Sequence, residues 1–197
     1  MLDEARRRLV FPLDYATLDE ARAAATRIAP AVGVLKVGLE LFVREGPRAV
    51  ELAHELGLDV FLDLKLHDIP ETVGRAVAAA AALKVRYLTV HAAGGSAMLR
   101  RASQEAAQAE GLILLAVTVL TSLDDRDLAA QGLSGGASAH ARRLADLARA
   151  SGVRGLVCSP AEAQQLRAAY GNDVLLVTPG IRPLAAGAPA AVRAAGA

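Results

Sequence analysis

The sequence predicts an α/β fold in which a parallel sheet closes into a (β/α)8 barrel. Short apolar runs alternate with longer Ala-rich stretches along the chain. The runs are apolar on both faces, which is typical of parallel strands covered by helices. Polar or charged residues stand at the ends of successive runs, and barrels of this kind carry their active-site groups at the carboxyl ends of several strands. An open doubly wound sheet is the competing architecture, but Asp14-Tyr15-Ala16 stands where its glycine fingerprint would follow the first run.

The expected elements follow one another in a regular βα order. We expect strands at the apolar runs 9–14, 34–38, 60–66, 87–92, 112–120, 155–159 and 174–179. We expect helices at 18–29, 47–56, 70–83, 96–109, 139–150 and 160–170. No linker interrupts the pattern, so the sequence predicts one domain over residues 1–197.

Local signals support two of the helix starts. Thr17 with Glu20, and Ser159 with Glu162, have the spacing of a capping box. Pro160 occupies the first position of the second of these helices, where its fixed φ and missing N–H are tolerated. Several expected helices are followed by a glycine that suits a helix C-terminus: Gly57, Gly111, Gly152 and Gly171.

Composition narrows the function classes. No apolar run reaches the roughly 18 residues of a membrane span, and the charged residues 1–8 lead straight into a strand without a secretory signal. The lone Cys158 permits no internal disulfide, so we expect a cytoplasmic protein. A net charge of +1 and 3% aromatic residues give no reason to expect a nucleic-acid or membrane surface. No spacing of His, Cys, Asp or Glu indicates a metal site.

The end of the third expected strand is unusually charged. In the run 61–70 (FLDLKLHDIP), Asp63 and Lys65 share a face with Phe61 because strands alternate faces with period two. By the same alternation Lys36 faces inward. Asp14 at the end of the first strand and Asp68 just after the third complete five charged groups that we expect to converge at one end of the barrel. An ion pair that only seals the interior is the alternative interpretation; the functional one is a fixed electrostatic array that stabilises charge developing in a transition state.

The charged run and other segments resemble the orotidine 5'-phosphate decarboxylase family, in its bacterial branch. The run 61–70 is similar to the signature of that family, and the similarity extends from about Leu9 to Arg182. The other matching segments, in order, are LD at 13–14, LKVG at 35–38, TVHAAGG at 89–95, VTVLTS at 117–122, VCS at 157–159 and VTPGIR at 177–182. The resemblance implies a TIM barrel that decarboxylates orotidine 5'-phosphate to UMP in de novo pyrimidine biosynthesis, without metal or organic cofactor.

The resemblance also implies roles for individual residues. Lys65 supplies a cation and then the proton for C6 of the pyrimidine, and Asp63 lies against the departing carboxylate. Lys36 orients Asp63 and a ribose hydroxyl, and Asp14 binds the ribose. Asp68 reaches the site of a neighbouring subunit, which implies a homodimer with shared active sites. The further residues that the resemblance implies as substrate contacts are Ile69, Pro70, Glu71, Thr72, Thr121 and Arg182.

Other histidines near the motif are assigned no catalytic role. His91 ends an apolar strand, and we expect a hydrogen-bonded core histidine there. His67 lies beside the motif and stays unassigned.

The sequence departs from the family after Arg182. It lacks a match to the family's phosphate-binding Gln and to the Gly-Arg pair that ends the eighth strand, and 189–197 resembles the helix before that strand. We therefore expect a barrel whose eighth strand is missing from this chain. Two alternative functions stay open. The Asp-x-Lys-x-x-Asp strand also resembles that of Mg²⁺-dependent sugar-phosphate decarboxylases and aldolases, and the missing strand suggests a shortened barrel that binds nucleotides without turnover.

Overall fold

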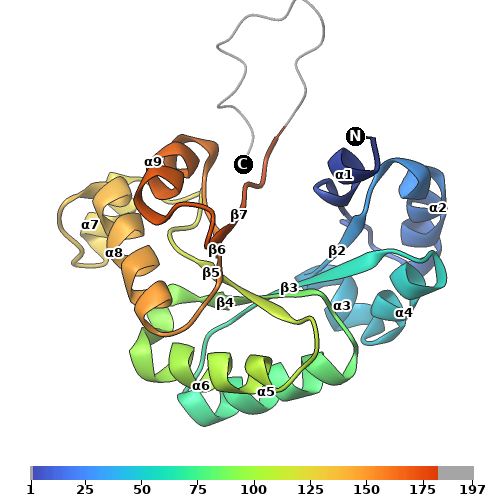
Figure 1. Ribbon diagram of the computed structural model, residues 1–197, viewed down its shortest axis with the longest axis horizontal. Coiled ribbons are helices and arrows are strands. Elements are labelled where there is room, and N and C mark those ends of the chain that lie inside the picture. The colour runs from blue at the N-terminus through green and yellow to red at the C-terminus, as the bar shows by residue number, and fades with distance from the viewer. Residues whose placement is uncertain (1, 182–197) are drawn as a thin grey trace, which may run out of the picture.

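Seven parallel strands form one curved sheet in the part of the chain that the structure describes, residues 2–181 of a computed structural model. The strands lie side by side in chain order, β1 to β7, and every neighbouring pair is parallel. Helices cover the outer side of the sheet, and within residues 2–181 the curve stays open between β7 and β1 (Figure 1). Within these described residues the architecture is that of a (β/α)8 barrel with seven of its strands, as the sequence predicts.

The elements have the following bounds. The strands are β1 (Val10–Pro12), β2 (Val34–Gly38), β3 (Asp59–Leu66), β4 (Tyr87–His91), β5 (Ile113–Val117), β6 (Gly155–Val157) and β7 (Leu175–Val177). The α-helices are α1 (Leu2–Arg7), α2 (Leu18–Ile28), α3 (Leu39–Glu45), α4 (Arg48–Glu55), α5 (Pro70–Ala82), α6 (Gly95–Ala107), α7 (Asp125–Ala130), α8 (Gly136–Ala150) and α9 (Pro160–Tyr170). Two short 3₁₀ helices, η1 (Ala29–Ala31) and η2 (Ala92–Gly94), complete them.

Three helices in the described residues lie outside the six helical stretches expected from the sequence, although residues 124–127 suit either a loop or a helix start. The expectation that the charged N-terminus leads straight into a strand is wrong, because α1 precedes β1. Helix α3 directly follows β2, and no side chain caps its start at Gly38, so no local signal marks it. Helix α7 has a full capping box between Asp124 and Asp127. The capping box expected at Ser159 is confirmed, whereas at Thr17 only the side-chain acceptor for the Glu20 N–H is present.

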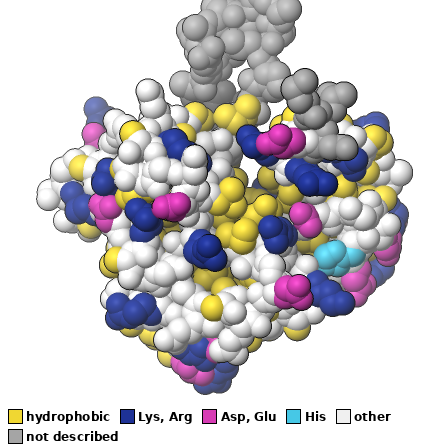
Figure 2. Space-filling model, in the orientation of Figure 1, with side chains coloured by type: hydrophobic (Ala, Val, Ile, Leu, Met, Phe, Trp, Pro, Cys, Tyr) yellow, Lys and Arg dark blue, Asp and Glu magenta, His cyan; other side chains and the backbone are white. Residues whose placement is uncertain are grey.

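Two apolar layers hold the sheet. The larger lies between the strands and the helices and includes Leu35, Leu62 and Leu88, all fully buried. The smaller lines the inner face of the curve, with Val34, Phe61 and Leu115 at its centre. Apolar side chains gather in a hollow at the middle of the molecule, with basic side chains around it (Figure 2). The strands are therefore apolar on both faces, as a parallel sheet covered by helices requires.

Strand β3 is irregular where its charged residues lie. Leu62 pairs with Leu88 and Leu66 pairs with Val90, so β3 advances from 62 to 66 while β4 advances only from 88 to 90. The extra residues form a bulge, and Lys65 within it has a φ of 49°. A positive φ is uncommon for a residue other than glycine and is found preferentially at functional sites. The bulge thus re-aims the end of β3.

Two further expectations concern membrane spans and domain organisation. Among residues 2–181, no helix is both long enough and apolar enough to cross a bilayer. The prediction of a single domain over 1–197 stays a prediction, and the helix expected at 189–197 lies outside the described residues.

Candidate active site

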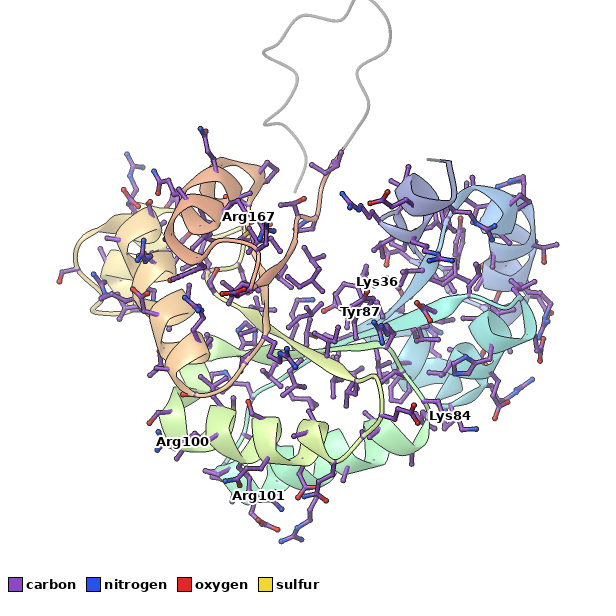
Figure 3. All side chains as sticks on the ribbon, in the orientation of Figure 1. Lys36, Lys84, Tyr87, Arg100, Arg101 and Arg167 are labelled. Atoms are coloured by element: carbon purple, nitrogen blue, oxygen red, sulfur yellow. The ribbon has the colours of Figure 1, made fainter. Side chains whose placement is uncertain are left out.

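The charged residues of the first three strands meet on the inner side of the sheet. Lys36 is on β2, Asp63 and Lys65 are on β3, and Asp14 follows β1 two residues after its end. Lys36 lies on the inner side of the curved sheet, where Figure 3 labels it. All four groups stand toward the carboxyl ends of their strands, which is the end where barrel active sites are built. The period-two prediction that Lys36 faces inward is confirmed.

Asp63 is the centre of a chain of alternating charges. Its Oδ2 accepts a hydrogen bond from Lys65 Nζ at 2.8 Å and lies 3.7 Å from Lys36 Nζ. Lys36 Nζ in turn lies 3.3 Å from Asp14 Oδ1. The order is Asp14, Lys36, Asp63, Lys65, which we call the charge array. Four of the five charged groups expected at this end of the barrel come together within one chain.

Exposure differs sharply along the charge array. The Asp63 side chain is 12% exposed, Lys36 is 23%, Lys65 is 32% and Asp14 is 69%. A buried carboxylate is costly unless it is paired and hydrogen-bonded, and Asp63 has two ammonium neighbours. The two end members, Asp14 and Lys65, are the most exposed of the four. The charge array is therefore anchored at Asp63 and open at its two ends.

Thr89 is a further neighbour of Asp63 that was not predicted from the sequence. Thr89 on β4 is fully buried. Its hydroxyl donates a hydrogen bond to Asp63 Oδ1 at 2.9 Å and accepts one from the backbone N–H of Lys65 at 2.9 Å. Alternation along β4 places Thr89 on the inner face together with His91, and this was the signal available in the sequence.

Asp68 does not join the charge array within one chain. It is exposed, and its Oδ1 accepts a hydrogen bond from the Ile69 N–H at 2.6 Å. Among the described residues it forms no ion pair with Lys36 or Lys65, which corrects the expectation of five converging groups. The reason is geometric: the chain turns away after Leu66 to begin α5 at Pro70.

The segment around Asp68 borders two hollows of the surface. A cavity of about 320 Å³ is lined by Lys65, His67, Asp68 and Thr72 among others. A second, of about 550 Å³, is lined by His67, Asp68, Ile69, Pro70, Ala93 and Gly94. Thr72, which the family resemblance implies as a substrate contact, therefore borders the same cavity as Lys65. Ile69 and Pro70, implied in the same way, border the second cavity, which Lys65 does not line.

The remaining residues of the predicted site are farther along the chain. Thr121 is exposed in the segment between β5 and α7. Arg182 lies outside the described residues. Thr121 is not among the residues that contact the charge array within residues 2–181. The assignment of Thr121 and Arg182 to the substrate remains a prediction.

Two histidines lie beside the charge array. The rings of His67 and His91 have their centroids 5.4 Å apart. Burial lowers the pKa of His91, and the nearby His67 and Lys65 lower it further, against the opposing effect of Asp63. His91 is half-buried and, within residues 2–181, has no hydrogen bond to another protein group. The expectation of a hydrogen-bonded core histidine is therefore wrong, because the ring borders the site.

The surroundings of Cys158 and the grouping of acidic and histidine side chains are two further features of residues 2–181. Burial raises the pKa of the Cys158 thiol to about 11, so the reactive thiolate is disfavoured. Among residues 2–181, no three His, Cys, Asp or Glu side chains come together in a way that could hold a metal ion.

A (β/α)8 sheet with lysine and aspartate side chains alternating at the ends of its first strands defines a class: barrel enzymes with a charged site at the carboxyl ends of their strands. Comparison with known proteins specifies the family. Residues 7–195 match the model of the orotidine 5'-phosphate decarboxylase / HUMPS family. The chain belongs to this family, and the prediction of a decarboxylase-family enzyme is confirmed.

Individual relatives agree. Orotidine 5'-phosphate decarboxylase from Anaeromyxobacter sp. is 53% identical over 179 residues, covering 91% of this chain and 78% of the relative. The enzyme of the same name from Chromohalobacter salexigens is 50% identical, covering 91% and 77%. The crystal structure of orotidine 5'-phosphate decarboxylase from Lactobacillus acidophilus superposes with a TM-score of 0.82 at 36% identity, covering 90% of this chain and 82% of that one.

Proposed function

We propose that this chain converts orotidine 5'-phosphate to UMP and CO₂ in pyrimidine biosynthesis, with no metal ion or organic cofactor. Relatives that are about half identical and span most of the chain carry the name of this activity. The observation that carries the proposal is the charge array, with Lys65 Nζ held 2.8 Å from Asp63 Oδ2 at the carboxyl end of β3. It supplies the groups that a metal-free decarboxylation needs.

The reaction requires a positive charge and a proton at one carbon. The bond from C6 to the carboxylate carbon breaks, CO₂ leaves, and the electron pair stays on C6. That pair lies in the ring plane, outside the π system, so only the surrounding field can stabilise it. Lys65 places an ammonium there and donates a proton to C6, forming the C–H bond of UMP. The neutral amine then regains a proton from solvent.

The other members of the charge array position the reacting groups. Asp63 lies against the carboxylate of the substrate, where its charge favours departure of CO₂, and it holds the Lys65 ammonium in place. Lys36 bridges Asp63 and Asp14, so it can orient Asp63 while it binds a ribose hydroxyl. Asp14, the most exposed member, binds the ribose. Because the charges are fixed before substrate arrives, little reorganisation accompanies the reaction.

The proposed function includes a homodimer with shared sites. Asp68 is exposed and makes no ion pair with the charge array of its own chain among the described residues, and the neighbouring Ile69 leaves 66% of its surface exposed. An acidic group and an apolar group side by side at the entrance suit contact with a second copy of the chain. In this arrangement Asp68 of one subunit completes the site of the other, and Ile69, Pro70 and Thr72 contact the substrate there. Thr121 and Arg182 bind on the nucleotide's base and phosphate sides.

The metal-dependent alternative is disfavoured by charge. A divalent cation placed at Asp63 would meet two ammonium groups, one 2.8 Å and the other 3.7 Å from the same carboxylate oxygen. Like charges at such distances repel strongly in a partly buried site. Because Lys65 belongs to the motif that both classes share, Lys36 is the group that argues against a divalent cation at Asp63.

The test is decarboxylation of orotidine 5'-phosphate, followed by the fall in its ultraviolet absorbance, in EDTA and in Mg²⁺. We expect equal turnover in both. Turnover that disappears in EDTA, or appears only with a sugar phosphate, would favour the metal-dependent class instead. Tight UMP binding without any turnover would indicate a nucleotide-binding barrel.

A further inference from the structure

Thr89 joins the backbone of Lys65 to the carboxylate of Asp63. The Lys65 N–H donates to Thr89 Oγ1 at 2.9 Å, and the Thr89 hydroxyl donates to Asp63 Oδ1 at 2.9 Å. Asp63 Oδ2 accepts from Lys65 Nζ at 2.8 Å. These three bonds form a closed ring, from the Lys65 backbone through Thr89 and Asp63 to the Lys65 ammonium. A hydroxyl can donate one hydrogen bond and accept others. The Thr89 hydroxyl donates its proton to Asp63 and uses a lone pair to accept from Lys65.

The ring lies at the bulge of β3. Where β3 carries extra residues, the regular ladder to β4 is interrupted between Leu62 and Leu66, and the Lys65 N–H lies within that interruption. A buried N–H without an acceptor is costly. Thr89 Oγ1 supplies the acceptor that the β4 backbone would otherwise provide, and Lys65 holds its positive φ of 49°. A strained conformation persists only where its surroundings fix it.

The two oxygens of Asp63 thereby have different tasks. Thr89 occupies Oδ1, so Oδ2 is the oxygen that faces Lys65 and Lys36. Without the hydroxyl, the carboxylate could rotate about its last bond and exchange its oxygens, and the direction of the Lys65 ammonium would no longer be defined. The position of that ammonium relative to C6 decides whether proton transfer is geometrically possible.

We propose that Thr89 is a positioning residue for the decarboxylation: its hydroxyl fixes both the bulged backbone of Lys65 and the orientation of Asp63. This inference rests on the proposed function. Thr89 itself, fully buried behind Asp63, acts on the reaction through these two groups and takes no part in substrate binding.

The experiment compares Thr89→Val, which keeps the shape and removes the hydroxyl, with Thr89→Ser, which keeps the hydroxyl. Thr118→Val is the matched control, since Thr118 is also buried but its hydroxyl reaches only a backbone carbonyl, that of Val157 at 3.4 Å. The wild-type chain is assayed first, so that failure of the proposed function is recognised separately. The measurements are kcat and KM for orotidine 5'-phosphate, the affinity for UMP, and the urea midpoint.

We expect Thr89→Val to lose about 100-fold in kcat, the cost of a misplaced reacting group, with UMP affinity unchanged. Thr89→Ser should recover most of the activity, and Thr118→Val should keep it. Full activity in Thr89→Val would overturn the inference. An equal loss of kcat in Thr89→Ser would also overturn it, because the hydroxyl would then not be the group that matters. So would a Thr89→Val chain that fails to fold where Thr118→Val folds, because the hydroxyl would then serve the fold.

Discussion

At the scale of single residues, the site depends on one nearly buried carboxylate. Asp63 has Thr89 on one oxygen, and Lys65 and Lys36 near the other. Removing either lysine would leave a buried negative charge with fewer partners, so the four side chains of the charge array support one another. Such coupling means that single substitutions here will not have additive effects.

His91 gives the site a dependence on pH at the level of stability. Burial, then His67 and Lys65, lower its pKa in the folded protein below the ordinary value of 6.5. The unfolded chain therefore takes up this proton at a higher pH than the folded protein does, and acidification in that interval favours unfolding. We expect the free energy of unfolding to fall as the pH drops below about 6.5, and to level off once both states are protonated.

The check is urea unfolding of the wild type and of His91→Asn at several pH values. The two proteins are first compared at a pH where His91 is neutral in both the folded and the unfolded state. On acidification from there, the free energy of unfolding should fall less in the variant than in the wild type. An unchanged pH slope in His91→Asn would show that this ring does not contribute.

The residue-level prediction from the sequence was correct where strand alternation decides it. Alternation alone places Lys36, Asp63 and Lys65 on the inner face, and the structure joins them. Thr89 was missed because its role depends on the register between β3 and β4, including a bulge that no local pattern marks. Asp68 forms no ion pair with the charge array of its own chain among the described residues, and its assignment to the site of a neighbouring subunit stays a prediction.

At the scale of elements, local sequence signals predicted some bounds of helices and strands correctly and others incorrectly. The predicted bounds of β2 and α9 agree with the structure, and α9 begins at the predicted capping box with Pro160 in its first turn. Strand β5 was predicted to run to 120 but ends at Val117, because the apolar pattern continues after the ladder to its neighbours has stopped. Helix α3 was missed because no side chain caps its start.

The capping box of α9 is a testable part of the fold. Ser159 Oγ accepts a hydrogen bond from the Glu162 N–H at 3.3 Å, and Glu162 Oε2 accepts one from the Ser159 N–H at 2.8 Å. We expect Ser159→Ala to lower the free energy of unfolding by about 1 kcal/mol, measured by urea denaturation. Ser138→Ala, at an exposed position in the first turn of α8, is the control and should not destabilise the protein. Equal stability of Ser159→Ala and wild type would contradict a stabilising cap.

At the scale of the whole molecule, the order of strands explains why the site forms at one place. Because β1, β2, β3 and β4 are adjacent and parallel, their carboxyl ends bring Asp14, Lys36, Asp63 and Thr89 together from distant positions in the chain. The (β/α)8 class was predictable from the alternation of elements. Contacts between subunits were not predictable in this way. They depend on how two surfaces fit together, and the pattern of one sequence does not reveal that fit.

Mixing two inactive variants tests the proposed sharing of sites. Lys65→Ala retains Asp68, and Asp68→Ala retains Lys65, so a mixed dimer contains one site with both groups and one with neither. Random exchange of equal amounts makes half of the dimers mixed, and we expect about one quarter of wild-type activity to return. Activity of the mixture equal to the mean of the separate variants would indicate that each site is built from a single chain.

The most direct measurement is the turnover of orotidine 5'-phosphate by Lys65→Ala beside Lys84→Ala. Both lysines have a positive φ, 49° and 55°, so the two substitutions place alanine in a similar backbone conformation. Lys84 precedes the amino end of β4, away from the charge array, and Figure 3 labels it apart from Lys36. We expect Lys65→Ala to lose nearly all turnover, since cation and proton donor disappear together, while Lys84→Ala keeps it. Comparable turnover in the two variants would contradict the central role of the Lys65 ammonium.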